Sequence, residues 1–273
     1  MVRVLEQENE IFTLSPIRSQ RIDVTDFESL KSLPIKEIDI VFHLAAHTDI
    51  EDSLRDPRRT VFNNCVSTLN ILELCRLFEM KLIYMSSYLY GKPQYLPTDE
   101  SHPLSPTNPY ALSKMIAETM CNYYIDNYNI KCITLRPFNV YGIGQPEKKY
   151  SVVGIIKQIG KGEVEIENEM EKRDYIYVSD VVDALIKAGH CVERISDVFN
   201  IGTGNSYTLP ELVTLLLKIS GKNPKLTIGR KFSSYIPETR ADIGKAEKEL
   251  DWHPKIDIFT GMKKLWDYYG NKS

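Results

Sequence analysis

The chain has 273 residues, of which 42% are hydrophobic and 26% are charged, and its formal net charge is −3. This balance is typical of a globular protein with one large domain, or with a core domain and a smaller lobe. The slightly negative charge argues against nucleic acid or a membrane surface as a partner. No apolar stretch approaches the ~18 residues of a membrane-spanning helix, and the N-terminus lacks a signal-peptide pattern, so we expect a cytoplasmic protein.

Strand-like and helix-like patterns alternate through the first half of the chain. The predicted strands are 10–16, 38–46, 81–87 and 131–142, and the predicted helices are 25–33, 57–80 and 108–128. Near-continuous apolar runs such as "IDIVFHLAA" are typical of parallel strands that are covered on both faces. The alternation therefore predicts βαβ crossovers in an α/β fold with a doubly wound, Rossmann-like parallel sheet.

Beyond about Gly142 the pattern loosens into short strands, turns and the predicted helices 209–219 and 242–250. This change predicts a small C-terminal lobe for the substrate, near the carboxyl ends of the strands. We therefore assign residues 1–142 to the Rossmann-like core, with returning segments around 173–204. Residues 143–273 are expected to form mostly the substrate-binding lobe.

The glycines are distributed unevenly, since all 14 lie from Gly91 onward. A sheet that binds a dinucleotide normally carries a glycine-rich turn after its first strand, where the backbone approaches the pyrophosphate at a helix N-terminus. We interpret the chain as N-terminally truncated, beginning inside the first helix, with "EIFTLSP" (10–16) as its first strand. Three explanations stay open: a misplaced start, a partner chain that fills the gap, or a fold with lost or altered cofactor binding.

The five cysteines indicate neither a zinc site nor a disulfide framework, because none of them forms a CxxC pair. They are Cys65, Cys75, Cys121, Cys132 and Cys191. We expect reduced and mostly buried thiols.

The stretch "YALSK" places Tyr110 and Lys114 four residues apart, on one face of a helix. A tyrosine that abstracts a proton near neutral pH needs its pKa of about 10 lowered, and an adjacent ammonium group does this. Upstream, "SSYLYG" follows a predicted buried strand, where the active-site groups of such sheets gather. A serine there can hydrogen-bond a substrate hydroxyl or carbonyl and assist proton transfer.

These two stretches belong to a longer series of motifs along the chain. The series is "HLAA", "NNCVSTLNILELCR", "MSSYLYG", "NPYALSK", "LRPFNVYG", "KRDYIYVSDVVDAL", "FNIGTG" and "ADIGKAEKELDWHP". In this order the motifs resemble the extended short-chain dehydrogenase/reductases of the NAD(P)-dependent nucleotide-sugar epimerase/dehydratase type.

The resemblance implies a role for individual residues. The implied catalytic residues are Ser86, Tyr110 as base or acid, and Lys114, which lowers the pKa of Tyr110 and holds the nicotinamide ribose. The implied cofactor-binding residues are Asp23, Ala45, Ala46, Asn64, Lys114, Pro137 and Phe138. The implied substrate-binding residues are Ser87, Asn139, Arg173 and Arg240, with Ser87 also an alternative to Ser86. No metal is implied, and we expect His43 to be a core histidine.

Two departures from the family pattern bear on the chemistry. In the hexose dehydratases an Asp–Glu pair follows the catalytic Thr, and here Ser87 and Tyr88 occupy those positions. Neither side chain can supply the proton transfers of water elimination at neutral pH, so we do not expect that reaction. After its second strand the family often has an acidic residue that selects NAD. This chain has Ser15 and Arg18 there, which favours NADP over NAD.

Two functions remain in view. The first is a nucleotide-sugar epimerase acting at carbon 4, or a keto-sugar oxidoreductase, with the Ser-Tyr-Lys triad and NAD or NADP as cofactor. The alternative is a non-catalytic relative that acts as a sugar-nucleotide-binding or partner subunit. We also expect a homodimer that pairs through the helices 57–80 and 108–128. The second helix carries Met115, Met120, Tyr123 and Tyr124, and such residues are common in interfaces.

Residues 1–273 alone are expected to bind NAD and NADP much more weakly than an intact relative does. Each charge-assisted hydrogen bond contributes roughly 1.5–3 kcal/mol, so the loss of two or three at the pyrophosphate weakens binding by several powers of ten. Calorimetric titration with the oxidised and reduced forms of both cofactors measures this affinity. Micromolar or tighter binding would show that other groups rebuild the phosphate site.

Overall fold

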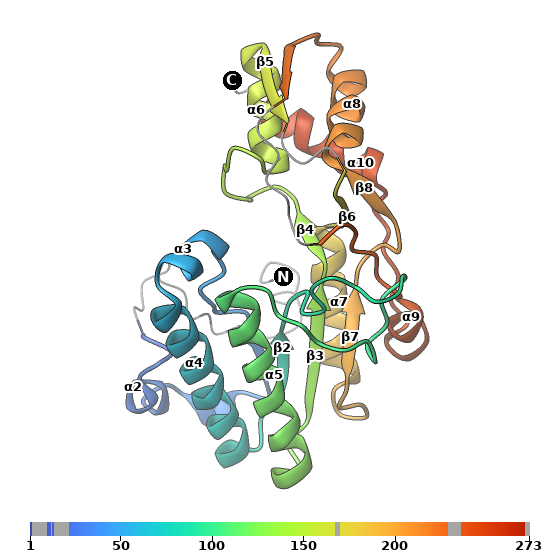
Figure 1. Ribbon diagram of the computed structural model, residues 1–273. Coiled ribbons are helices and arrows are strands. Elements are labelled where there is room, and N and C mark those ends of the chain that lie inside the picture. Colours follow the sequence, from blue (N-terminus) through green and yellow to red (C-terminus); the bar gives the residue numbers. More distant parts are fainter. Residues whose placement is uncertain (2–9, 12, 14–21, 167–169, 229–235, 271–273) are drawn as a thin grey trace. The chain divides into compact units, whose positions relative to one another are not determined.

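The computed structural model describes the chain except for residues 2–9, 12, 14–21, 167–169, 229–235 and 271–273 (Figure 1). The chain forms two compact units. The first comprises residues 1–90, 103–136 and 183–199, and the second comprises residues 91–102, 137–182 and 200–273. The units thus divide the chain before Gly142, and the segment that returns to the core is shorter than the expected 173–204.

The first unit is built around a parallel sheet with the strand order β1-β2-β3-β7. The strands are β1 (Ile40–His43), β2 (Lys81–Met85), β3 (Cys132–Pro137) and β7 (Val198–Ile201). Phe42 of β1 pairs with Ile83 of β2, which in turn pairs with Ile133 of β3. These strands are short and apolar, as expected for a parallel sheet that is buried on both faces.

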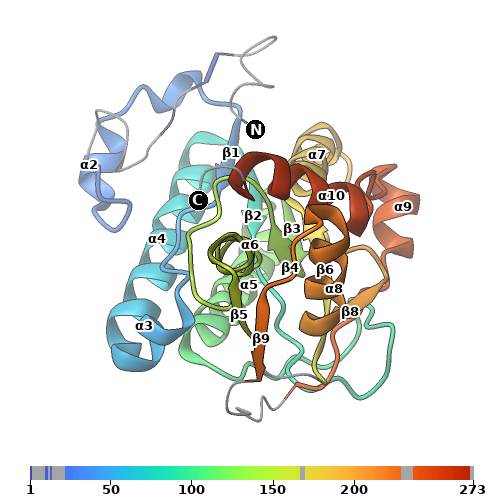
Figure 2. The same cartoon turned by 90° about the horizontal axis from the view of Figure 1, so that it is seen from above.

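Helices cover both faces of this sheet (Figure 2). The helices described in this unit are α2 (Phe27–Lys31), the short η1 (Ile35–Glu37), α3 (Ile50–Arg55), α4 (Pro57–Phe78), α5 (Pro109–Tyr128) and the second half of α7 (Val178–Cys191). Leu82 and Tyr84 pack into one core cluster with residues of α4 and α5. Phe42 points to the other face, where a Cβ on Gly189 of α7 would lie 3.1 Å from its ring. The predicted α/β class with a doubly wound, Rossmann-like sheet is therefore confirmed.

The N-terminal predictions have different outcomes. The predicted strand 10–16 falls largely outside the described residues, and the first strand that the structure describes is β1. The predicted helix 25–33 is α2, which Asp26 caps by accepting hydrogen bonds from the backbone amides of Glu28 and Ser29.

The second unit contains a three-stranded sheet and a separate strand pair. The sheet has the order β4-β6-β8 and consists of β4 (Asn139–Tyr141), β6 (Lys172–Tyr177) and β8 (Ser206–Thr208). The pair consists of β5 (Glu163–Ile166) and β9 (Lys225–Ile228). The helices are α6 (Val152–Lys161), the first half of α7, α8 (Leu209–Ser220), α9 (Gly244–Leu250), α10 (Ile258–Leu265) and η2 (Trp266–Gly270). The predicted helices 209–219 and 242–250 are α8 and α9.

The predicted strand 131–142 is wrong as a single element. It forms two strands, β3 and β4, which belong to different sheets. Phe138 lies between them and donates its backbone N–H to the carbonyl of Ile201 at 2.9 Å. The break has a tertiary cause, because β3 pairs with β2 while β4 pairs with β6.

Several predicted properties of the chain can be compared directly with the structure. All five cysteines are free and four of them are buried, as expected. In the described part of the chain, no three His, Cys, Asp or Glu side chains are grouped so that they could hold a metal ion. Over the same residues, no helix is both long and apolar enough to cross a membrane.

Candidate active site

The start of α5 positions Tyr110 and Lys114. Asn108 caps this helix, since its side-chain oxygen accepts a hydrogen bond from the backbone N–H of Ala111 at 2.8 Å. Pro109 occupies the first turn, where its missing N–H costs nothing. Tyr110 therefore lies in the first turn of α5, and Lys114 lies one turn later on the same face.

Lys114 links α5 to the end of β2. Its side chain is only 2% exposed, and its Nζ donates a hydrogen bond to the carbonyl oxygen of Met85 at 2.7 Å. The ammonium group also lies 4.8 Å from the centre of the Tyr84 ring. Burial lowers the pKa of Lys114 to about 8. The group is thus a buried cation with a carbonyl and a ring as described neighbours.

The lowered pKa of Lys114 predicts a pH dependence of stability. In the unfolded chain the ordinary pKa is 10.5, so between pH 8 and 10.5 the folded protein has released a proton that the unfolded chain still holds. The free energy of unfolding therefore rises with pH, by about 2 kcal/mol between pH 7 and 9.5. Lys114→Met should lack this rise when urea unfolding of both proteins is compared at the two pH values. Parallel pH dependences would contradict the buried-cation assignment.

Burial raises the pKa of Tyr110, the opposite of the lowering expected from Lys114, and the nearby side chain of Ser87 lowers it. Both residues are half-buried. The segment after β2 thus places a serine near the tyrosine at the start of α5.

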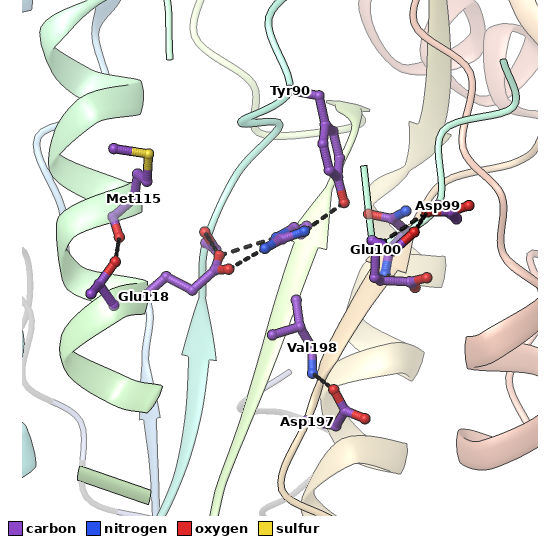
Figure 3. Close-up of polar contacts among 12 residues, drawn as sticks. Tyr90, Asp99, Glu100, Met115, Glu118, Asp197 and Val198 are labelled. Atoms are coloured by element: carbon purple, nitrogen blue, oxygen red, sulfur yellow. Dashed lines mark hydrogen bonds and ion pairs between the residues drawn. The ribbon is translucent and has the colours of Figure 1, made fainter. Parts of the chain in front are cut away.

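Ser86 has a different partner from Ser87. Its side chain is buried, and its hydroxyl donates a hydrogen bond to Oε2 of Glu118 at 2.9 Å. Glu118 lies on α5, one turn beyond Lys114, and forms a buried ion pair with Arg136 of β3. Figure 3 shows Glu118 reaching from α5 to a guanidinium group, which in turn contacts Tyr90. Sequence reasoning missed Glu118, although it continues the four-residue spacing of Tyr110 and Lys114.

Asn64 organises the loop that follows β1. Its side chain is 2% exposed; the oxygen accepts from the backbone N–H of His47 at 2.7 Å. Its amide nitrogen donates to the carbonyl of His47 at 3.1 Å and to the hydroxyl of Ser113 at 2.8 Å. Asn64 of α4 therefore connects its helix by hydrogen bonds to the loop after β1 and to α5. The two implied cofactor contacts in this loop differ in exposure, since Ala45 is exposed and Ala46 is half-buried.

Two other residues of the first unit can be placed. Asp23 is exposed, and its Oδ1 accepts from the backbone N–H and the hydroxyl of Thr25 at 2.9 and 2.8 Å. His43 is 3% exposed and pairs with Thr68 at 3.1 Å, so the expectation of a core histidine is confirmed. Ser15 and Arg18, which favoured NADP, lie outside the described residues.

The remaining implied residues lie in the second unit. Pro137 and Phe138 are buried, whereas Asn139 on β4 is exposed. Arg173 donates from Nη1 to the carbonyls of Lys172 and Ile236, and from Nη2 to Glu171. Arg240 is 39% exposed, its Nε is 3.8 Å from Glu238, and that buried atom has no hydrogen-bond partner among the described residues.

Asp174 is a second residue that sequence reasoning missed. Its carboxylate accepts hydrogen bonds from the backbone and hydroxyl of Thr203 and from the backbones of Gly204 and Ala241, at 2.7–3.0 Å. A Cβ on Gly202 would lie 2.8 Å from its Oδ2, which explains the glycine. Asp174 thus ties β6 to the residues that follow β7 and to the segment that carries Arg240.

Comparison with known proteins identifies the family. Residues 2–202 match the model of the NAD dependent epimerase/dehydratase family. The UDP-glucose 4-epimerase of Mycolicibacterium smegmatis is 30% identical over 260 residues, which cover 93% of this chain and 83% of the relative. The chain belongs to the NAD dependent epimerase/dehydratase family.

Solved structures of similar proteins share this fold. RMD from Pseudomonas aeruginosa, complexed with NADPH, has a TM-score of 0.88 at 26% identity and covers 100% of this chain and 94% of its own. UDP-glucose 4-epimerase from Thermotoga maritima, solved with UDP-glucose, has a TM-score of 0.82 at 30% identity, with coverage of 93% and 84%. The resemblance drawn from the motifs is thereby confirmed for the family and the fold.

Ser87 and Tyr88 follow Ser86 in the chain. The ring of Tyr88 packs edge to face against Tyr90, with centroids 5.4 Å apart. Neither position carries a carboxyl group.

Proposed function

We propose that the protein interconverts nucleotide-sugars through a keto intermediate, as a carbon-4 epimerase or a keto-sugar oxidoreductase, with Tyr110 as its acid–base group. The observation that carries this proposal is the placement of buried Lys114 on α5, one helical turn from Tyr110, with its Nζ bound to the carbonyl oxygen of Met85 just before Ser86 and Ser87. The printed names of the relative and of the Thermotoga structure, both UDP-glucose 4-epimerases, support the substrate class.

The first unit offers groups that fit the nicotinamide end of a dinucleotide. Lys114 provides a buried ammonium, and exposed Ala45 leaves the backbone of the loop after β1 open to a ligand. NAD and NADP both remain possible cofactors. When bound, the nicotinamide ring supplies the hydride acceptor, or the donor in the reverse direction.

The residues of this chain would handle the proton and hold the substrate. Tyr110 removes the proton of the sugar hydroxyl and returns it when the ketone is reduced. Ser86 and Ser87 orient the hydroxyl groups around Tyr110, and the charge of Lys114 favours the phenolate. We assign Asn139, Arg173 and Arg240 to the nucleotide and its pyrophosphate, because a guanidinium can bind two phosphate oxygens at once. The Nε of Arg240 has no hydrogen-bond partner among the described residues, which supports this assignment.

A nucleotide-sugar panel tests the proposal. Purified protein is incubated with UDP-hexoses and their N-acetylated forms, with NAD or NADP at millimolar concentration, and the products are separated by chromatography. We expect interconversion of 4-epimers or reversible formation of a keto sugar. Tight binding of a nucleotide-sugar without turnover under any of these conditions would favour the alternative, a non-catalytic sugar-nucleotide-binding or partner subunit.

We also propose that two copies pair through α4 and α5. Large apolar side chains are exposed on these helices, namely Phe62, Leu69 and Leu77 on α4 and Leu112 and Tyr123 on α5. Of the side chains expected in the interface, Tyr123 is 55% exposed, whereas Tyr124 is 8% exposed and hydrogen-bonds Glu73. The exposed apolar surface is what a homodimer would cover.

Leu69→Asp is expected to weaken this dimer about 100-fold or more, since a symmetric interface would bury two like charges. Light scattering across micromolar concentrations measures the effect. Leu54→Asp on α3, at a position 60% exposed, is the matched control and should leave the association unchanged. A monomeric unsubstituted protein at micromolar concentration would refute the dimer.

A further inference from the structure

The two adjacent serines after β2 are held in different ways. Ser86 is fixed twice, because its backbone N–H donates to the carbonyl of Leu135 at 2.8 Å and its hydroxyl donates to Glu118 at 2.9 Å. Ser87 is half-buried, and its side chain lies near enough to Tyr110 to lower the pKa of the phenol. The position of the Ser87 hydroxyl therefore depends on how firmly Ser86 is held.

The group that holds Ser86 is itself part of a buried ionic network. The side chains of Glu118 and Arg136 are 3% and 6% exposed, and the guanidinium binds both carboxylate oxygens (Figure 3). Arg136 also donates from Nη1 to the hydroxyl of Tyr90 at 2.8 Å. Oε2 of Glu118 accepts from both Arg136 Nε, at 3.1 Å, and Ser86. The Glu118–Arg136 pair thus joins α5 and β3 to both ends of the 86–90 segment.

Stability alone is a poor explanation of such a pair. Removing two charges from water is costly, and apolar residues of similar size often replace a buried ion pair without loss of stability. Apolar residues could not, however, accept the hydrogen bond of the Ser86 hydroxyl. Tyr110, Lys114 and Glu118 follow one another at four-residue intervals on α5, so a shift of the 86–87 backbone relative to this helix would change the position of Ser87 relative to Tyr110.

We propose that Glu118 is a positioning residue of the active site: as the acceptor for the Ser86 hydroxyl, and held in place by Arg136, it fixes the Ser86–Ser87 segment against the helix that carries Tyr110. This inference deepens the proposed function and rests on it for the role of Tyr110 in turnover. Glu118 acts through Ser86 and touches neither the substrate nor the cofactor.

Two double variants separate positioning from packing. Glu118→Gln with Arg136→Met removes both charges but keeps an oxygen that can accept from Ser86. Glu118→Leu with Arg136→Met also removes both charges, and removes the acceptor as well. Each variant avoids an unpaired buried charge, and thermal unfolding shows whether the two are equally folded. The kcat of the Gln–Met variant should stay within about threefold of the unsubstituted protein. The kcat of the Leu–Met variant should fall about 100-fold with KM nearly unchanged, because small misplacements of reacting groups have effects of this size.

A second measurement needs neither substrate nor cofactor. The ultraviolet absorbance of each protein is measured against pH, with and without the additional substitution Tyr110→Phe. The difference between the two curves reports the ionisation of Tyr110. Tyr84 on β2 interacts electrostatically with Tyr110, and the ammonium group of Lys114 lies 4.8 Å from the centre of the Tyr84 ring. Both residues are kept in all variants. The titration midpoint should rise by about one pH unit in the Leu–Met variant, through displacement of Ser87, and stay unchanged in the Gln–Met variant.

The outcomes distinguish this inference from the proposed function. If the unsubstituted protein turns over no nucleotide-sugar, the proposed function fails, and the titration still tests the role of Glu118. Equal midpoints and equal kcat in the two double variants would overturn the positioning role and leave the ion pair as core structure. A higher midpoint and lower kcat in the Leu–Met variant alone would support it.

Discussion

Tyr110→Phe is expected to lower kcat about 10²- to 10⁴-fold, the range that a positioned acid–base group contributes. The substitution removes only the hydroxyl, so the ring continues to pack at the start of α5. The affinity for the nucleotide-sugar should change by less than about threefold, because the Tyr110 hydroxyl transfers a proton in the reaction and does not bind the nucleotide. Steady-state kinetics at saturating cofactor, together with calorimetric titration of the nucleotide-sugar, measure the two effects.

The matched control is Tyr128→Phe at the other end of the same helix, where the side chain is 46% exposed. It removes the same hydroxyl from α5 and should leave kcat unchanged. A Tyr110→Phe protein that keeps more than about a third of its activity would assign the proton transfer to another group, contrary to the range expected for an acid–base residue.

Asp174→Ala should lower the free energy of unfolding by about 3–5 kcal/mol, because buried donors that lose their acceptor each carry a penalty of roughly 1–3 kcal/mol. The carboxylate receives hydrogen bonds from Thr203, Gly204 and Ala241, and it is fully buried. The loss would release the segment next to Arg240, so we also expect weaker nucleotide-sugar binding. Urea unfolding monitored by circular dichroism measures the stability, and calorimetry measures the binding.

Asp174→Asn keeps the shape of the side chain and one acceptor oxygen. Its free energy of unfolding should therefore lie between those of the unsubstituted protein and of Asp174→Ala. Asp267→Ala is the surface control: Asp267 is 58% exposed and forms one ion pair with Lys263, so its loss should change stability by less than about 1 kcal/mol. An Asp174→Ala protein as stable as this control would show that the carboxylate does not hold the segments together.

The local elements of the fold were predictable because their signals lie within a few residues. α4 and α5 each have a side-chain cap and an N-terminal proline, and the structure places them at Pro57–Phe78 and Pro109–Tyr128, close to the predicted 57–80 and 108–128. The break between β3 and β4 was not predictable in this way. It arises because Phe138 and its neighbours on either side pair with strands from different parts of the chain.

Residues of the candidate site could be predicted where they belong to a short sequence motif. Residues whose partners are distant in the sequence could not be predicted in this way. Tyr110, Lys114 and the two serines belong to short motifs. Glu118 and Arg136 are 18 residues apart, and Asp174 and Ala241 are 67 apart, so no local pattern connects them. The division of roles between Ser86 and Ser87 also needed coordinates, since the sequence shows only two adjacent hydroxyls.

In the reaction that we propose, a hydride moves at the sugar carbon while Tyr110 moves the hydroxyl proton. The most direct test is to run the reaction with a UDP-hexose in deuterium oxide, with NAD or NADP supplied, and to examine carbon 4 of the recovered sugars by nuclear magnetic resonance. Our account predicts a 4-epimer whose carbon-bound hydrogen at that position remains protium, because the hydride does not exchange with solvent. Deuterium on carbon 4 of the epimer would show that the carbon itself is deprotonated, and would contradict the account.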